Sequence, residues 1–166
     1  NVTIQTPYVI CNGYMYDTLN EIASHAQLKI ILNAVEKGSN PWGCTDYLNQ
    51  KKKILETGAD VYELMNDYPV HTKAVLINDR LSVVGSYNLD MRSTYLDTEL
   101  MLVIDSEKLS QQIHETESDY MEKSKEVLAN GQETEGAKYQ GKVLNRKKKL
   151  YYGVLRIIIR PLRQLL

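Results

Sequence analysis

The chain of 166 residues contains no Phe, four Pro and only two Cys. Cys11 and Cys44 are too few for a disulfide framework, which fits a protein of a reducing compartment such as the cytoplasm. No secretory signal peptide is visible, and the chain begins without Met, inside the alternating apolar run Val2 to Gln5. We therefore expect a fragment of a longer protein, so the missing targeting signal excludes little.

The remaining composition is that of an ordinary globular domain, with 43% apolar and 25% charged residues. The net charge is -1, but its two signs are separated along the chain. Nine of the 20 Lys and Arg residues, and none of the 21 Asp and Glu residues, lie in residues 136–166. This asymmetry predicts an acidic domain over residues 1–135, followed by a basic linker and tail that meets an anionic surface.

Apolar runs that suit strands alternate with helical patterns along the domain. We expect strands at residues 1–10, 28–35, 61–65 and 99–105. We expect helices from Asp17 or Thr18 to His25, from 46 to 57 with Gly58 as C-cap, and from 105 or 106 to about 128, with loops at 11–16 and 37–45 and a linker at 131–141. The pattern predicts an α/β sandwich in which helices flank a mixed β-sheet.

Polar residues recur at fixed spacing within the stretch 71–88, HTKAVLINDRLSVVGSYN. Residues two apart share one face of an extended strand, so His71 and Lys73 are expected to project side by side. The chain then turns and returns, which lets Ser86 and Asn88 reach the same place. An imidazole, an ammonium, a hydroxyl and a carboxamide that converge predict a phosphate site with a nucleophile in it.

The same stretch resembles a known motif. Asp79 lies six residues after the lysine at a turn, Gly85 precedes Ser86, and the chain continues as NLDMRSTYLDTE from residue 88 to residue 99. The arrangement resembles the HKD motif of the phospholipase D superfamily, and its continuation is most similar to the cardiolipin synthase branch. The resemblance covers the first two-thirds of the chain and implies a phospholipase D-like α/β sandwich with one HKD half. Asp79 and Gly85 are expected to serve the structure of the motif.

The resemblance implies a two-step phosphodiester exchange through a phosphohistidine, with neither metal nor other cofactor. His71 is the implied nucleophile, because a neutral imidazole is available near neutral pH. Lys73 and Asn88 would bind the non-bridging phosphate oxygens, and Ser86 would donate to the phosphate or the histidine. Glu99 is implied to accept a hydrogen bond from the far nitrogen of His71.

The superfamily site uses two HKD motifs, whereas this chain has one. Its other two histidines, His25 and His114, lack the motif around them. The second motif is therefore expected from a missing N-terminal half, which the start at Asn1 favours, or from a homodimer mate about a twofold axis. One motif histidine would be the nucleophile and the other the general acid, and a single half leaves open which is which.

The C-terminal tail predicts a basic amphipathic helix. At about 100° per residue, Lys149, Arg156, Arg160 and Arg163 fall within about a 60° sector, opposite apolar residues. Such a helix is too charged to span a bilayer, and contact of its basic face with an anionic membrane is expected. Packing against the domain or the absent half is the alternative. Pro161 is expected to kink or end the helix.

Together these features predict a peripherally membrane-associated phosphatidyltransferase or phosphodiesterase, similar to cardiolipin synthase, that acts on a phospholipid. One alternative is a phospholipase D-type hydrolase or nuclease that is active as a homodimer. Nucleic acid is the less favoured substrate, because the body around the motif is acidic. A non-catalytic half that binds a membrane or a partner is the third possibility.

Overall fold

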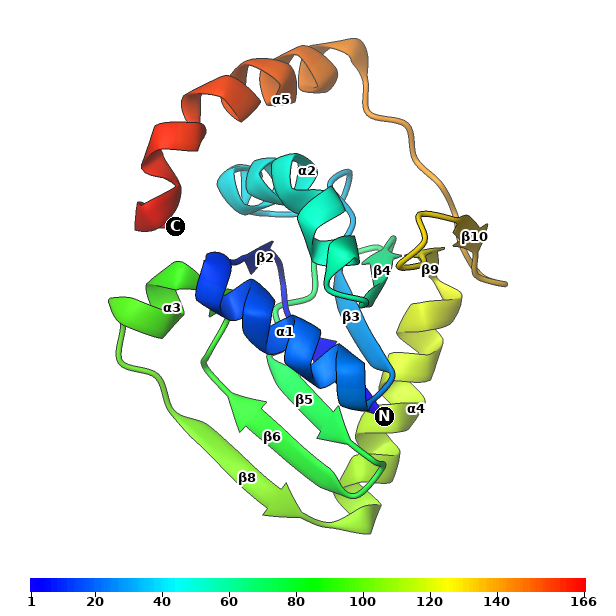
Figure 1. The fold of residues 1–166 in the computed structure, drawn as a ribbon. Coiled ribbons are helices and arrows are strands. Elements are labelled where there is room, and N and C mark those ends of the chain that lie inside the picture. Colours follow the sequence, from blue (N-terminus) through cyan, green and yellow to red (C-terminus); the bar gives the residue numbers. More distant parts are fainter.

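The computed structural model describes residues 1–166, except for the side chain of Gln164. The strands are β1 (Val2–Gln5), β2 (Val9–Ile10), β3 (Leu28–Asn33), β4 (Asp60–Leu64), β5 (Ala74–Ile77), β6 (Leu81–Gly85), β7 (Leu89–Asp90), β8 (Met101–Asp105), β9 (Ser124–Val127) and β10 (Glu133–Glu135). The helices are α1 (Gly13–His25), α2 (Pro41–Glu56), α3 (Met91–Tyr95), α4 (Glu107–Glu122), α5 (Arg146–Ile158) and the 3₁₀ helix η1 (Arg160–Leu165). The order of strands and helices is drawn in Figure 1.

Within the described residues, eight strands form one mixed sheet in the order β10-β9-β4-β3-β1-β5-β6-β8. Strands β1, β3 and β4 are parallel, whereas β5, β6 and β8 continue from β1 as an antiparallel run. The short strands β2 and β7 pair in parallel beside this sheet. The predicted α/β fold with a mixed sheet flanked by helices is confirmed.

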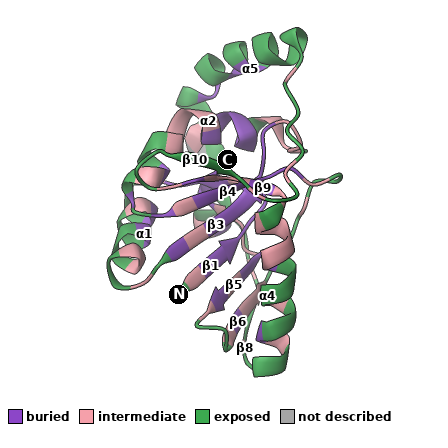
Figure 2. Ribbon diagram, turned by 90° about the vertical axis from the view of Figure 1, so that its right-hand side faces the viewer, coloured by how far each residue is buried: buried purple, intermediate pink, exposed green. Residues whose placement is uncertain are grey.

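Helices cover both faces of the sheet, α1 and α2 on one side and α4 on the other (Figures 1 and 2). The main core lies between α1, α2 and the parallel strands, where Ile30, Ile54 and Val61 are fully buried. A smaller core lies under α4, where Ile31 of β3 packs near Tyr120. Alternate residues of β3 thus serve opposite faces, as a strand of period two requires when both faces are covered.

Two helices begin earlier than the sequence predicts. Helix α1 starts at Gly13 because the side chain of Asn12 accepts a hydrogen bond from the Met15 N–H, so the expected loop at 11–16 is wrong. Helix α2 starts at Pro41 under the cap of Asn40, so the expected loop at 37–45 ends there. The expected stop after α2 is confirmed, since Gly58 has φ +89°.

The chain after α4 is more ordered than expected. Helix α4 ends at Glu122, and two short strands, β9 and β10, occupy the expected end of that helix and part of the expected linker. Strand β9 pairs antiparallel with β4 and extends the sheet. The tail then forms α5, which packs across α2, and Pro161 lies at the start of η1.

Candidate functional site

His71 and Lys73 lie in an extended segment that leads into β5, and not within the strand itself. The Lys73 ammonium is 2.8 Å from His71 Nδ1 and also donates to the His71 carbonyl at 2.9 Å. The lysine side chain is buried, whereas the histidine is exposed. The two predicted residues are therefore adjacent, with the imidazole accessible from solvent.

The surroundings of both residues lower their pKa values. Desolvation lowers the pKa of His71, and the nearby Lys73 charge lowers it further. Desolvation also lowers the pKa of Lys73, although the carboxylates of Glu99 and Asp90 oppose that shift. An imidazole with a lowered pKa is unprotonated at neutral pH, as a nucleophile has to be.

Asn33, at the end of β3, holds the segment that enters the motif. Its amide Nδ2 donates to the Val70 carbonyl at 2.8 Å and to the Pro7 carbonyl at 3.1 Å, and its Oδ1 accepts from the Val70 N–H at 2.8 Å. The side chain is buried, so these bonds are shielded from water. The role of Asn33 could not be predicted from the sequence, because Asn33 and Val70 are 37 positions apart.

Ser86 follows β6 and faces the same site. Its hydroxyl donates to Glu99 and accepts from the Leu100 N–H at 3.0 Å. A side chain at Gly85 would meet the Leu100 carbonyl oxygen at 2.0 Å, so only glycine allows β8 to approach this closely. Hydrogen bonds from Ser86 and Ser93 lower the pKa of Glu99, and the Lys73 charge adds to that effect.

In the described residues Glu99 makes no hydrogen bond to His71, contrary to the implied role. Its partner is the Ser86 hydroxyl, because Glu99 precedes β8 and β8 pairs with β6. The negative charge of the Glu99 carboxylate still acts on Lys73 and opposes the lowering of the lysine's pKa. The arrangement therefore gives Glu99 the position of a counter-charge to the lysine and an acceptor for the serine.

Asn88 lies beside a second serine that the sequence analysis did not assign. Its backbone N–H donates to Ser93 Oγ at 3.2 Å, and its side-chain Nδ2 lies 3.4 Å from the same oxygen. Asp90 caps the short helix α3 by accepting from the Ser93 N–H at 2.6 Å. The Asn88 Oδ1 is buried and has no partner among the described residues. These contacts hold Asn88 against the start of α3.

The aspartate of the motif departs from the family pattern. Counted from His71, the pattern HxKxxxxD places its aspartate at position 78, where this chain has Asn78 followed by Asp79. Both residues have positive φ, 48° and 53°, in the turn between β5 and β6. Asp79 pairs with His114 Nδ1 at 3.3 Å at that far end of the hairpin, away from His71.

The four basic tail residues assigned to membrane contact divide into two pairs. Arg163 pairs with the buried Asp46 and donates to the Cys11 carbonyl at 2.6 Å, and Arg156 donates to Asn49 Oδ1 at 2.8 Å. Both arginines therefore contact the domain, which is the alternative that the sequence left open for the tail. Arg156 is nevertheless exposed, as are Lys149 and Arg160.

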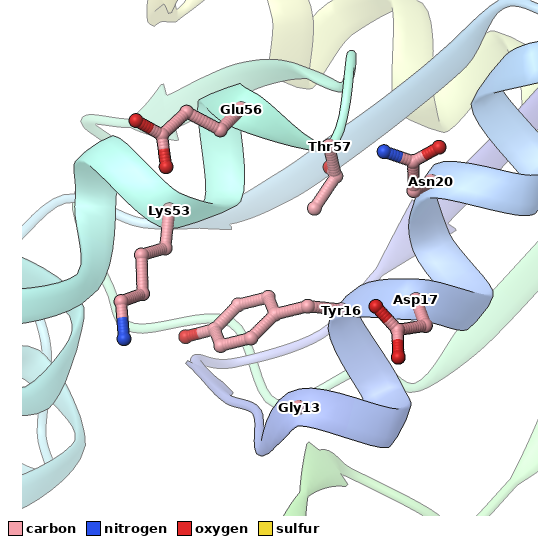
Figure 3. A pocket seen from close by; sticks show the side chains of 7 residues that line it. All are labelled: Gly13, Tyr16, Asp17, Asn20, Lys53, Glu56 and Thr57. Atoms are coloured by element: carbon pink, nitrogen blue, oxygen red, sulfur yellow. The ribbon is translucent and has the colours of Figure 1, made fainter.

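A cavity of about 310 Å³ lies apart from the motif, between α1 and α2 (Figure 3). Tyr16 and Asp17 of α1 line it from one side, and Lys53 and Glu56 of α2 line it from the other. A second cavity of about 250 Å³ reaches the motif segment at Thr72. In the part of the chain that the structure describes, no cluster of His, Cys, Asp and Glu could hold a metal ion. None of the described helices has the length and apolar character needed to span a bilayer.

The chain is similar to known proteins both in sequence and in fold. The chain is 29% identical over 150 residues to cardiolipin synthase A of Proteus mirabilis. The match covers 87% of this chain and 29% of that protein. It thus spans less than a third of the length of this curated relative. Its fold is similar to that of Nuc, a phospholipase D family member from Salmonella typhimurium, with a TM-score of 0.61, 16% identity and coverage of 75% of this chain and 80% of Nuc.

A larger solved structure matches nearly the whole chain. Phosphatidylserine synthase of Haemophilus influenzae aligns with 99% of this chain and 41% of its own, with a TM-score of 0.65 and 16% identity. The sequence profile of one family, described as "Cardiolipin synthase, PLD-like domain", matches residues 1–119. The chain therefore belongs to the cardiolipin synthase branch of phospholipase D-like domains.

Proposed function

We propose that this chain supplies one catalytic half of a phosphatidyltransferase that exchanges the alcohol of a phospholipid phosphodiester. The observation that carries the proposal is the exposed imidazole of His71, whose Nδ1 lies 2.8 Å from the ammonium of the buried Lys73 and whose pKa is lowered by its surroundings. An open imidazole and a buried cation suit attack on a phosphodiester, whose charge otherwise repels nucleophiles.

In the proposed first step a nitrogen of His71 attacks phosphorus, and the bond from phosphorus to the leaving alcohol oxygen breaks. A general acid gives that oxygen a proton. In the second step the hydroxyl of an acceptor alcohol loses its proton to the same group and attacks phosphorus, and the bond to His71 breaks. Lys73 and Asn88 bind the non-bridging oxygens, on which charge develops in both transition states.

Ser86 and Glu99 support this exchange from the side of β8. The Ser86 hydroxyl donates a hydrogen bond to the Glu99 carboxylate and accepts one from the Leu100 N–H. These two hydrogen bonds together fix the rotamer of the serine. The negative charge of Glu99 also keeps Lys73 protonated against desolvation. We propose that Glu99 acts by positioning Ser86 and holding the charge of Lys73, and that it leaves His71 free to react.

The general acid has to come from outside this motif. His25 lies at the end of α1 and contacts Ser24 and the Glu21 carbonyl, and His114 pairs with Asp79. We propose a second HKD motif as its source, in another part of the protein or in a second copy of the chain about a twofold axis. The length of the relatives supports a further half.

Transfer of a phosphatidyl group between phosphatidylglycerol molecules in vesicles tests the function. His71→Ala should abolish transfer in the complete protein, whereas His25→Ala, which removes an exposed histidine outside the motif, should not. With a phospholipid labelled at phosphorus, acid-labile label should accumulate on the wild type and be absent from His71→Ala. Residues 1–166 should be inactive as a monomer. Turnover by His71→Ala, or label on another residue, would contradict the proposal.

The same assay separates transfer from hydrolysis. The accessible imidazole of His71 leaves its phosphorylated form open to water as well as to an alcohol. Release of free headgroup without new diphosphatidyl product, at saturating acceptor alcohol, would make the protein a phospholipase D-type hydrolase.

A further inference from the structure

The tail helix α5 and the following η1 present two opposite faces. On the inner face Tyr152, Leu155 and Ile159 are buried. Arg156 and Arg163 lie on this face as well and bind α2. The tail is therefore attached to the domain by Arg156 and Arg163, two of the four residues that the sequence pattern assigned to membrane contact.

The outer face is apolar and bare. Leu150 is 71% exposed and Ile157 70%, and Val154 and Ile158 are about half exposed. At about 100° per residue these four side chains fall within about a 100° sector, opposite the inner face. Leu165 continues the exposed apolar surface on η1. We call these five residues the outer strip. Figure 2 shows α5, mostly exposed, at the upper edge of the molecule.

The charged residues of the tail that carries the outer strip all have one sign. Four consecutive cations, Arg146 to Lys149, begin α5, and the exposed Arg160 follows its end. Residues 136–166 contain no Asp or Glu. An isolated apolar strip of this kind marks an interaction site, and a purely cationic border selects a partner that is apolar inside and anionic at its surface.

We propose that the outer strip docks on an anionic lipid bilayer, with its side chains at the boundary of headgroups and acyl chains and Arg146 to Lys149 on the lipid phosphates. This corrects the face predicted from the sequence, because Arg156 and Arg163 hold the helix to the domain while apolar residues meet the lipid. The inference deepens the proposed function, since a phosphatidyltransferase has to reach its lipid, but it rests on surfaces that are separate from the motif.

Sedimentation of residues 1–166 with vesicles tests the proposal. Vesicles of phosphatidylglycerol and phosphatidylcholine should bind the chain, and vesicles of phosphatidylcholine alone should bind it much less. Leu150→Asp combined with Ile157→Asp should reduce partition at least about tenfold, because each change removes one apolar side chain that the bilayer would bury. Lys147→Glu combined with Lys148→Glu should also reduce it about tenfold or more.

Val143→Asp is the matched control, since it makes the same change at a residue that is 84% exposed before α5. This variant should bind as the wild type does. His71→Ala should also bind normally, which separates failure of the docking proposal from failure of the proposed chemistry. Circular dichroism checks that each variant is folded.

Three results would overturn the docking proposal. The first is recovery of the wild type entirely in the supernatant at every lipid concentration. The second is binding of the doubly substituted strip equal to that of Val143→Asp. The third is a dimer in solution, detected by light scattering, that the same strip substitutions dissociate, which would make a second copy of the chain the occupant of the strip.

Discussion

Glu117 gives the clearest prediction for the stability of the fold. It lies on the inner side of α4, is fully buried, and neither of its carboxylate oxygens has a hydrogen-bond partner among the described residues. Its pKa is raised to about 8, chiefly by desolvation and also by the nearby Asp79 charge, while the Lys29 charge opposes the shift. Glu117 is therefore protonated in the folded protein at neutral pH.

The sign of the effect follows from proton linkage. The unfolded chain releases the Glu117 proton near the ordinary pKa of 4.5, whereas the folded chain keeps it until about pH 8. The stabilising contribution of the proton is complete below pH 4.5 and is lost as the pH rises toward 8. At about 1.4 kcal/mol per unit, the full loss is about 5 kcal/mol, of which about 2 kcal/mol falls between pH 5 and pH 7.

Urea denaturation followed by circular dichroism at pH 5, 6, 7 and 8 measures this loss. Glu117→Gln should remove this pH-dependent loss of stability. The difference in free energy of unfolding, variant minus wild type, should therefore increase by about 2 kcal/mol from pH 5 to pH 7. The comparison uses the slope with pH, because the amide itself needs new partners and shifts the absolute value. Glu115→Gln, an exposed neighbour on α4, should follow the wild type. Parallel pH curves for wild type and Glu117→Gln would refute this reasoning.

Two further predictions concern the site. Transfer activity of the complete protein should survive EDTA, because Lys73 supplies the cation that the phosphate needs; loss on chelation with recovery on added Mg²⁺ or Zn²⁺ would contradict this. Asn33→Leu keeps the volume but removes the three bonds to Val70 and Pro7, and it should lower kcat at least about tenfold with little change in KM, while Asn33→Asp, which keeps the acceptor for the Val70 N–H, should lose less. Equal losses in both variants, or a loss explained by unfolding in urea, would count against a positioning role.

The sequence predicted those parts of the fold whose signals are local. A few consecutive residues are enough to predict the apolar strand β3 and the end of α2 at Gly58. The early starts of α1 and α2 were missed because Gly13 and Pro41 also suit loops, and the asparagine before each one decides for a helix only when its side chain turns to the backbone.

The strands after α4 depend on distant partners. Strand β9 reads as polar and charged, SKEV, and has no apolar alternation. Its Lys125 pairs with Glu63 of β4 at 3.1 Å and with Glu133 of β10 at 3.3 Å, and Lys51 of α2 meets the same Glu63 at 2.8 Å. This network joins α2 and β4 to β9 and β10, two pairs of segments that are far apart in the sequence, so no window of the chain could predict it.

Which face of the tail helix packs against the domain could not be predicted for a similar reason. A helical pattern shows that Arg156 and Arg163 share a face, but it does not show what that face meets. The deciding partner is Asp46, a fully buried carboxylate on α2 that only the arginine of the distant tail neutralises among the ion pairs described. With Arg163 bound to Asp46, Tyr152, Leu155 and Ile159 are buried on the same side, and the outer strip faces away from the domain.

The spacing of the motif itself follows from one hairpin. Strands β5 and β6 pair antiparallel from Ala74 with Val84 to Ile77 with Leu81, so the segment that enters β5 and the segment that leaves β6 meet at one end. The Gly85 N–H donates to the Lys73 carbonyl at 3.3 Å, which sets the lysine beside the segment that carries the serine and asparagine. A shift of one residue in this register would turn every side chain to the other face of the sheet. The fixed distance in sequence from lysine to serine is therefore the length of the hairpin, and the polar residues converge because its two strands are matched.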